Sequence, residues 1–414
     1  MIGAGIATLV IVCGFAAGVS QTDLSQAASE YDKNKADAEK EGLFFTREQV
    51  EARYAIAETD NGAMLIQSVL PLVRNLKIDR QRPFNEKSVV AHWAEIKPAV
   101  GTIDEASHRK FLMFKRDFSN PAATLFPEYS GVKDWVTLFV QLGHRAIEQG
   151  EMVNAEKYWE LAAYLANAMD QEGLLIGVLV RIASLAIIDR EIQLTIRAHG
   201  KDPSVVKMLD KVLTKLDKPY DLKLPIRMEH WFGTSMIDAI LNDPKSYSVM
   251  GSGSAVPREI QYGKYLPRFK AANMSRIHRF YADAAHMVPT NCDDLVAVQT
   301  AFENMDKSSI KKGLSYTILD IVGPVFGATG SAVAREIAQR NTLRQAVEIL
   351  KIGADPAAGL PLKGRFAMDV DGKPIRIKKG ATGWLIYSVG MDKVDDGGTD
   401  AVTGKGDYVV HMPR

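Results

Sequence analysis

Five aspartates lie close together near the C-terminus, in a stretch bounded by two apolar runs. They are Asp392, Asp395, Asp396, Asp400 and Asp407. Neighbouring carboxylates repel one another, so water or a cation must offset their charge. A hard divalent cation such as Ca²⁺ takes about six to eight oxygen ligands, often from carboxylates and backbone carbonyls on a flexible loop. The stretch therefore predicts a calcium-type site with these five residues as candidate ligands. A solvated acidic turn is the alternative, because Asp and Gly both favour turns.

The acidic stretch does not follow the EF-hand pattern. When Asp392 is taken as position one, Val394 falls at position three and Thr403 at position twelve. An EF-hand carries Asp or Asn and Glu at those positions. A cation bound here would neutralise the carboxylates and close the loop, so its expected role is structural and not catalytic.

Sequence motifs for common enzyme chemistry are absent. There is no HExxH pair, no P-loop ending in Lys-Ser/Thr and no G-x-S-x-G elbow. The two cysteines, Cys13 and Cys292, are too few for a thiolate metal site. The eight histidines show no paired metal spacing, and we interpret them, His278 included, as surface residues. We predict no catalytic residue and no organic cofactor.

The composition is that of a globular protein with substantial cores. The chain has 414 residues, of which 46% are hydrophobic and 24% charged, enough for two or three domains. Lysine and arginine number 51 and aspartate and glutamate 50, which gives a net charge of +1. These values exclude a disordered chain. Without a basic stripe interleaved with aromatic residues, nucleic-acid binding is not expected.

The N-terminal segment is apolar. Residues 1–19 contain no charged side chain. About 20 apolar residues in a helix cross the hydrocarbon core of a bilayer. Residues 1–20 are therefore predicted as a membrane anchor, with the membrane contacted through residues 1–19. A cleaved signal segment is one alternative, since small residues lie near a possible cleavage point, and a buried core helix is another.

Most of the remaining chain shows helical periodicity. Residues 21–60 predict a polar, solvated helix, and residues 61–330 predict a helical domain with a loop at 242–259, where Gly, Ser and Pro accumulate. Residues 331–414 begin with an amphipathic helix and change to short alternating runs, which predict a small antiparallel β unit. The predicted fold class is mainly α: an N-terminal membrane helix, a helical bundle and a small C-terminal antiparallel β unit.

One stretch of the helical domain resembles a single tetratricopeptide unit. In residues 132–171, two helical segments meet at Gly150. Gly143 and Ala155 are small where the two helices would cross, and Trp159 is a large residue at helical spacing from Ala155. No second copy occurs at the same period, and such arrays need several repeats to bury their faces. We therefore expect one tetratricopeptide-like hairpin within the bundle.

The C-terminal sequence resembles the head of type II secretion major pseudopilins. The motif DGKP (371–374) is followed by a basic run, WLIYSVG (384–390), Asp392, paired glycines and a late Asp407. In that family the head has a supporting helix, a DP-x-G-x-P-x-x-Y turn, a strand ending in YSLGADG and a Gly-rich acidic loop. The resemblance covers roughly the last eighty residues. It implies a calcium loop in which Asp392 and Asp407 are the matching ligands, together with backbone carbonyls.

The chain departs from the pilin pattern at several positions. Met391 and Lys393 stand where the pseudopilin loop has Ala and Gly, and Gly5 stands where pilins carry Glu. As a whole, the chain resembles an uncharacterised family of membrane-anchored bacterial proteins with a helical region and a tail reading GYLLYSVGPDGKDDGG. The matching stretches are 135–189 and 371–410. No biochemical activity comes with that family.

These features predict a non-enzymatic scaffold or interaction protein, anchored in the membrane on the extracytoplasmic side, with a calcium-type loop at its C-terminus. Its partner would be another protein or further copies of the chain. The alternative is a subunit of a secretion or pilus-like assembly, in which the apolar N-termini pack together. An enzyme of unknown class ranks third, because it requires a deep pocket that holds His230 or His278.

Overall fold

The computed structural model describes most of the chain. The described residues are 21–76, 89, 91–119, 126–242, 260, 265–290, 292–309, 313–317, 319, 326–381, 383–400 and 406–413. The predicted membrane segment (1–20) and residues 243–259 of the predicted loop lie outside these ranges, so both stay predictions. Within the described ranges, no helix has the length and apolar character needed to cross a membrane.

The described part of the chain is mainly helical, as the sequence predicts. Its longer helices are α2 (Tyr31–Lys40), α3 (Arg47–Tyr54), α4 (Ala63–Asn75), α6 (Trp93–Ser107), α7 (Pro127–Glu148), α8 (Met152–Ala168), α9 (Leu175–His199), α10 (Pro203–Leu216), α11 (Lys223–Asn242), α13 (Phe269–Met287), α14 (Leu295–Ser309) and α16 (Phe326–Ile352).

The predicted small antiparallel β unit is confirmed. Strands β1 (Arg376–Lys379), β2 (Gly383–Ser388) and β3 (Tyr408–Pro413) form one sheet in the order β1-β2-β3. Both pairings are antiparallel, and Ile386 of β2 lies between Ile377 of β1 and Val410 of β3. Ile386 and Val410 are fully buried, so the apolar side of this alternating pattern faces the rest of the protein.

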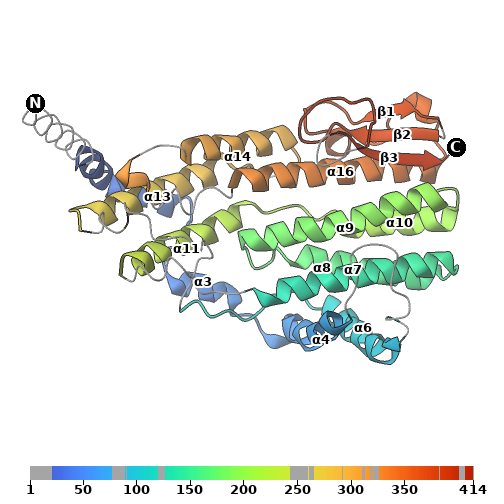
Figure 1. Ribbon diagram of the computed structural model, residues 1–414, viewed down its shortest axis with the longest axis horizontal. Helices are drawn as coiled ribbons and strands as arrows, with labels where there is room; N and C mark the ends of the chain where they lie inside the picture. The colour runs from blue at the N-terminus through green and yellow to red at the C-terminus, as the bar shows by residue number, and fades with distance from the viewer. Residues whose placement is uncertain are drawn as a thin grey trace, which may run out of the picture.

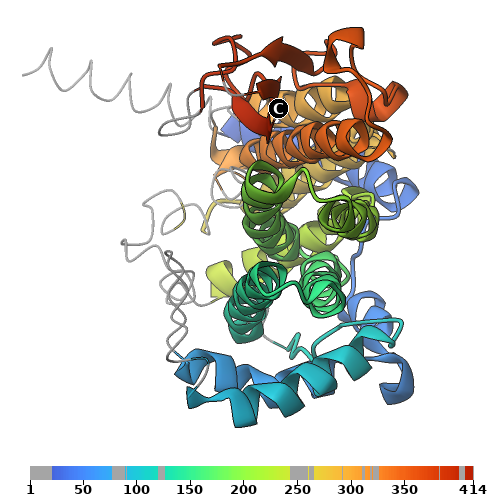
Figure 2. The same ribbon diagram turned by 90° about the vertical axis from the view of Figure 1, so that its right-hand side faces the viewer.

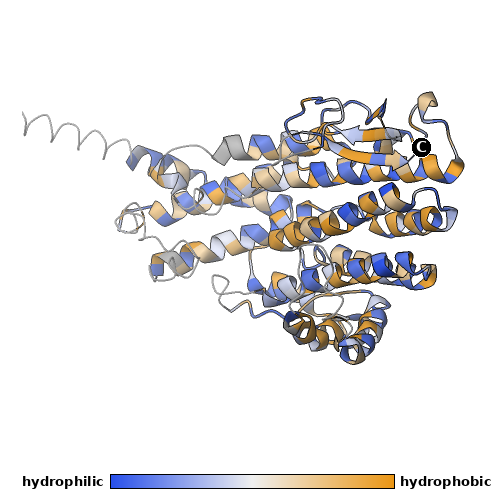
Figure 3. Cartoon of the chain, turned by 45° about the vertical axis from the view of Figure 1, so that its right-hand side comes forward, coloured by the Kyte–Doolittle hydropathy of each residue, from blue (hydrophilic) through white to orange (hydrophobic). Residues whose placement is uncertain are grey.

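The helices stack in layers. Figures 1 and 2 show α4 and α6 at one side, then α7 and α8, then α9 and α10, and then α16 with the sheet beyond it. Each layer packs on the next, since α7 contacts α9, α8 contacts α10, and both α9 and α10 contact α16. Hydrophobic residues occur on every layer of the stack (Figure 3). The single hairpin recognised in the sequence is therefore followed by further helices that continue the stack without repeating its motif.

The predicted close crossing of the two helices on either side of Gly150 is confirmed. Gly143 of α7 lies against the indole of Trp159 in α8, and a Cβ added at Gly143 would lie 2.1 Å from that ring. Trp159 is fully buried and its Nε1 donates to the carbonyl of Val140 at 3.1 Å. Ala155 is also fully buried. The pattern of small and large residues therefore reports a true close approach of two helices.

Residues 21–60 form more than one helix, although the sequence analysis expected one. Helix α2 ends at Lys40, and α3 begins after Thr46, where Thr46 and Gln49 form a reciprocal capping box. Helix α2 is also packed and not solvated throughout. Its Asn34 is buried and donates to the hydroxyl of Ser275 on α13 at 2.9 Å. The capping box thus starts a second helix within the polar segment. The side chain of Asn34 has its hydrogen-bond partner inside the bundle.

The C-terminal head, residues 369–413, is joined to the helical stack. Ile386 and Val410 of the sheet belong to the same buried cluster as Val347 of α16. The side-chain amide of Gln193 in α9 donates to the carbonyl of Val409 in β3. Helix α16 also runs across the boundary predicted at 330/331. The helical region and the head therefore share one hydrophobic core.

Candidate functional site

The five predicted aspartates all lie in the connection between β2 and β3, with Asp407 immediately before β3. Four of them are exposed, namely Asp392, Asp395, Asp396 and Asp400. Asp407 is fully buried. The five were predicted as one ligand set, whereas in the structure Asp407 is buried apart from the four exposed residues.

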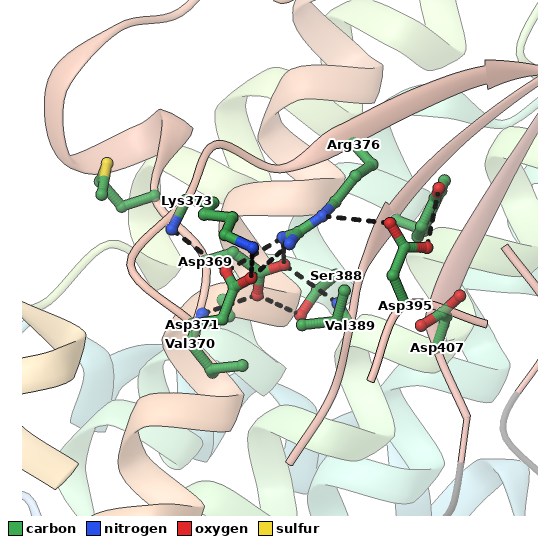
Figure 4. Close-up of polar contacts among 12 residues, drawn as sticks. Asp369, Val370, Asp371, Lys373, Arg376, Ser388, Val389, Asp395 and Asp407 are labelled. Carbon is green, nitrogen blue, oxygen red and sulfur yellow. Dashed lines mark hydrogen bonds and ion pairs between the residues drawn. The ribbon is translucent and has the colours of Figure 1, made fainter. Parts of the chain in front are cut away.

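An arginine offsets part of the negative charge of the head. Figure 4 shows Arg376 of β1 between Asp369 and Asp371 on one side and Asp395 on the other. Its Nη1 lies 2.6 Å from Oδ2 of Asp369 and 3.1 Å from Oδ1 of Asp371, and its Nε lies 3.8 Å from Oδ2 of Asp395. Arg376 thus offsets the charge of three carboxylates, of which Asp395 alone belongs to the five predicted from the sequence.

Asp369 is the most enclosed carboxylate of this group. It is fully buried and accepts hydrogen bonds from the Ser388 hydroxyl at 2.6 Å, from the Val389 N–H at 3.0 Å and from the Val370 N–H at 2.7 Å. Burial raises its pKa, although these bonds and the charge of Arg376 oppose that effect. Asp369 could not be recognised from the sequence, because only the folded turn brings it to the end of β2.

The exposed aspartates turn towards separate partners. Asp392 accepts from the N–H of Val394 at 3.2 Å, within its own turn. Asp395 accepts from the Tyr387 hydroxyl at 3.2 Å. A carboxylate oxygen of Asp400 lies 3.1 Å from Nε2 of His411. These contacts shape the loop and do not direct the exposed carboxylates at one point.

Asp407 is the predicted ligand that is buried, and backbone N–H groups face its carboxylate. Its carboxylate accepts from the N–H of Gly398 at 2.7 Å, and more weakly from the N–H of Asp396 at 3.5 Å. Burial raises its pKa, and the nearby charges of Asp395 and Asp396 add to the increase. Asp407 and Asp400 both line a hollow of about 230 Å³ beside the loop. Across the described residues, no three His, Cys, Asp or Glu side chains form a group that could hold a metal ion.

A pair of buried histidines was not anticipated. Nε2 of His230 in α11 lies 2.8 Å from Nδ1 of His278 in α13, and Nδ1 of His230 lies 2.8 Å from the carbonyl oxygen of Phe44. Their exposed fractions are 0% and 1%, so the interpretation of these histidines as surface residues is wrong. Burial lowers the pKa of His230 to about 4 and that of His278 to about 3. Both rings are therefore neutral at pH 7.

A second hollow lies where α6 meets the hairpin of α7 and α8. It encloses about 330 Å³ and is lined by Trp93, Leu142 and Tyr158, with Arg145 and Glu151 among its polar residues. Trp93 is 37% exposed, which is unusual for the largest apolar side chain. This hollow combines aromatic surface with one charge of each sign.

Comparison with known proteins gives no relative. No family model, no curated protein and no solved structure matches this chain. The resemblance of residues 371–410 to a pseudopilin head therefore rests on the sequence motifs alone.

Proposed function

We propose that this protein is a non-enzymatic scaffold, anchored in the membrane on the extracytoplasmic side, that binds a partner protein at the hollow beside Trp93. The observation that carries the proposal is the exposure of two apolar side chains on the helices that form the hollow. Trp93 is 37% exposed, and Val153, two residues after Glu151 at the start of α8, is 83% exposed. Aromatic anchors beside a pocket with charged residues around it are typical of protein-binding hot spots.

The architecture supports this role. Stacked helix pairs present extended surfaces that hold their shape because each layer packs on its neighbours. Tyr158, which lines the hollow, stacks on the buried Phe139 with ring centroids 6.3 Å apart and an interplanar angle of 18°. The hollow is thus built on a packed hairpin, and little ordering is needed before a partner binds.

The occupant would be an amphipathic segment of another protein. An apolar side chain would fill the space between Trp93 and Leu142, while Arg145 and Glu151 would pair with charged groups beside it. Photo-crosslinking from position 153 in living cells tests the proposal. An adduct of twice the mass of the chain would instead identify a second copy as the occupant, as a secretion or pilus-like assembly requires.

We further propose that the head takes a calcium-type cation at Asp407. In the described structure the charge of Asp407 is met by backbone N–H groups, whereas Arg376 serves Asp369, Asp371 and Asp395. Ca²⁺ binds carboxylates together with backbone carbonyls and water. Asp407 and Asp400, which line the same hollow, would supply the charged ligands. Such an ion would hold the β2–β3 connection in place and stabilise the head.

A further inference from the structure

A large hollow lies beside the buried histidine pair. It encloses about 680 Å³ and lies among α2, the segment 42–46 and α13. Tyr31 and Phe45 line it together with Met274 and His278. The ring of His278 lies 5.4 Å from that of Tyr31 and 5.4 Å from that of Phe45, measured between centroids. An imidazole and a thioether thus share one aromatic-walled space.

The hydrogen bonds of the pair fix the tautomer of both rings. A carbonyl oxygen can only accept, so Nδ1 of His230 carries a hydrogen and donates it to Phe44. Neutral His230 then presents Nε2 as an acceptor, and Nδ1 of His278 must donate to it. Nε2 of His278 is left with a free lone pair. It is buried and has no hydrogen-bond partner among the described residues.

This arrangement resembles that of metal-binding histidines. Histidines that bind metals through one nitrogen donate the other N–H to a fixed acceptor, which orients the ring and raises its basicity. His278 has that acceptor in His230, which is itself held by Phe44. Because the two nitrogens of an imidazole point in nearly opposite directions, Nε2 of His278 points away from His230. The low pKa of His278 keeps this nitrogen unprotonated at neutral pH.

The thioether sulfur of Met274 provides a second metal ligand. It lies four residues before His278 on α13, so the two side chains are on the same face of the helix, one turn apart. Both line the hollow. Thioether sulfur is a soft ligand that favours Cu(I) over hard divalent cations. We propose that Met274 and His278 bind a soft monovalent cation of the Cu(I) type, with the rings of Tyr31 and Phe45 around it.

The rim of the hollow carries one charge of each sign. Lys35 and Glu39, both lining residues, lie 3.8 Å apart as an exposed ion pair, so Glu39 offsets part of the positive charge of Lys35, which itself helps to lower the pKa of His278. The faces of aromatic rings carry negative potential and attract cations. Binding involves no electron transfer, because the ion enters and stays as Cu(I).

Anaerobic competition with a chromophoric Cu(I) chelator tests the proposal. The full chain carries Cys13→Ala and Cys292→Ala, so that no thiol competes for the ion. We expect one Cu(I) per chain, and at least tenfold weaker binding after Met274→Leu, which keeps volume and apolar character. The control is Met287→Leu in the same helix, a partly buried methionine that does not line the hollow. It should leave the affinity unchanged.

The ring-nitrogen NMR signals of His278 give a second readout. Addition of Cu(I), or of Ag(I) as its redox-inert analogue, should shift the Nε2 resonance of His278 and leave its Nδ1 hydrogen in place. His278→Ala should abolish binding, and if that variant does not fold, Met274→Leu still decides the question. Absence of competition, equal affinity in the Met274→Leu and Met287→Leu chains, or an unchanged His278 spectrum would overturn the proposal.

Discussion

The guanidinium of Arg376 lies 2.6 Å from the buried carboxylate of Asp369. This contact joins the turn before β1 to the end of β2, because Asp369 also accepts from Ser388 and from the N–H of Val389. The same guanidinium reaches Asp371 and Asp395. One arginine thus organises the carboxylates on one side of the head.

Replacing Arg376 by Gln is expected to destabilise the head. Removal of one partner from a buried ion pair leaves an uncompensated charge, here that of the fully buried Asp369, and should cost about 3 kcal/mol. The N–H of Val389 should also exchange with solvent faster, because the carboxylate that binds it loses its anchor. Urea unfolding and hydrogen exchange measure both effects. Lys373→Gln is the control, since its side chain is 75% exposed and should change stability by less than about 0.5 kcal/mol. Equal stability of the two variants would contradict the account.

The crossing of α7 and α8 predicts opposite effects for two glycine-to-alanine changes. In a helix, Ala is favoured over Gly by about 1 kcal/mol. Gly101 in α6 has no atom within 4 Å of its added Cβ, so Gly101→Ala should stabilise the protein by about that amount. At Gly143 the added Cβ would overlap the buried indole of Trp159, and Gly143→Ala should cost about 1–3 kcal/mol. Thermal unfolding measures both, and a gain in stability at Gly143 would be inconsistent with the close crossing.

The hairpin could be predicted because its signal is local. Gly143, Ala155 and Trp159 fall within 17 residues, and their sizes alone indicate a close helix pair. The layers that follow could not be predicted, since α9, α10 and α16 pack without a repeated motif, through aliphatic residues and buried charged ones such as Asp189 and Arg340. The sheet could also be predicted, because the alternation of apolar and polar residues along a strand is a local signal too.

The site contacts depend on the tertiary fold and were therefore missed. Asp369 and Ser388 are 19 residues apart and meet only after the turn and the sheet form. His230 and His278 are 48 residues apart, on two helices whose contact no sequence pattern predicts. The sequence held one indication that His230 is buried, because Met228 and Trp231 near it are apolar. Both of these residues are buried in the structure.

A buried carboxylate in the middle of the stack predicts a pH-dependent stability. Asp189 of α9 is 1% exposed, and its oxygens have no hydrogen-bond partner within the described structure. Burial raises its pKa to about 6, against the opposing effect of Arg340. The folded protein then keeps this proton up to about pH 6, whereas the unfolded chain releases it near pH 4. Its stabilising contribution is complete below pH 4 and is lost as the pH rises through 6.

Asp189→Asn removes this titration. Relative to the unaltered protein, the variant should gain about 1–3 kcal/mol of stability between pH 4 and pH 8. Urea unfolding at the two pH values gives the comparison. A difference between the two proteins that does not change with pH would contradict the assignment of the shift to Asp189.

Calcium is expected to raise the melting temperature through Asp407. An ion that binds only the folded head adds stability in proportion to the logarithm of its concentration, so millimolar Ca²⁺ should raise the Tm by several degrees relative to EDTA. Asp407→Asn should remove this increase. Asp283→Asn on α13, where the side chain is 57% exposed, is the matched control and should retain it. The same Tm in EDTA and in Ca²⁺ would contradict a calcium site and favour the alternative, a solvated acidic turn.

The most direct test of the scaffold proposal is photo-crosslinking in living cells from a photoreactive residue at Val153. The account predicts one discrete adduct, which becomes severalfold weaker when Trp93→Ala is added in the same chain. A photoreactive residue at Val296 of α14, another exposed valine with 39% exposure, should not give that adduct. Absence of an adduct from position 153, or an adduct that Trp93→Ala leaves unchanged, would contradict the claim that this protein binds a partner at the hollow beside Trp93.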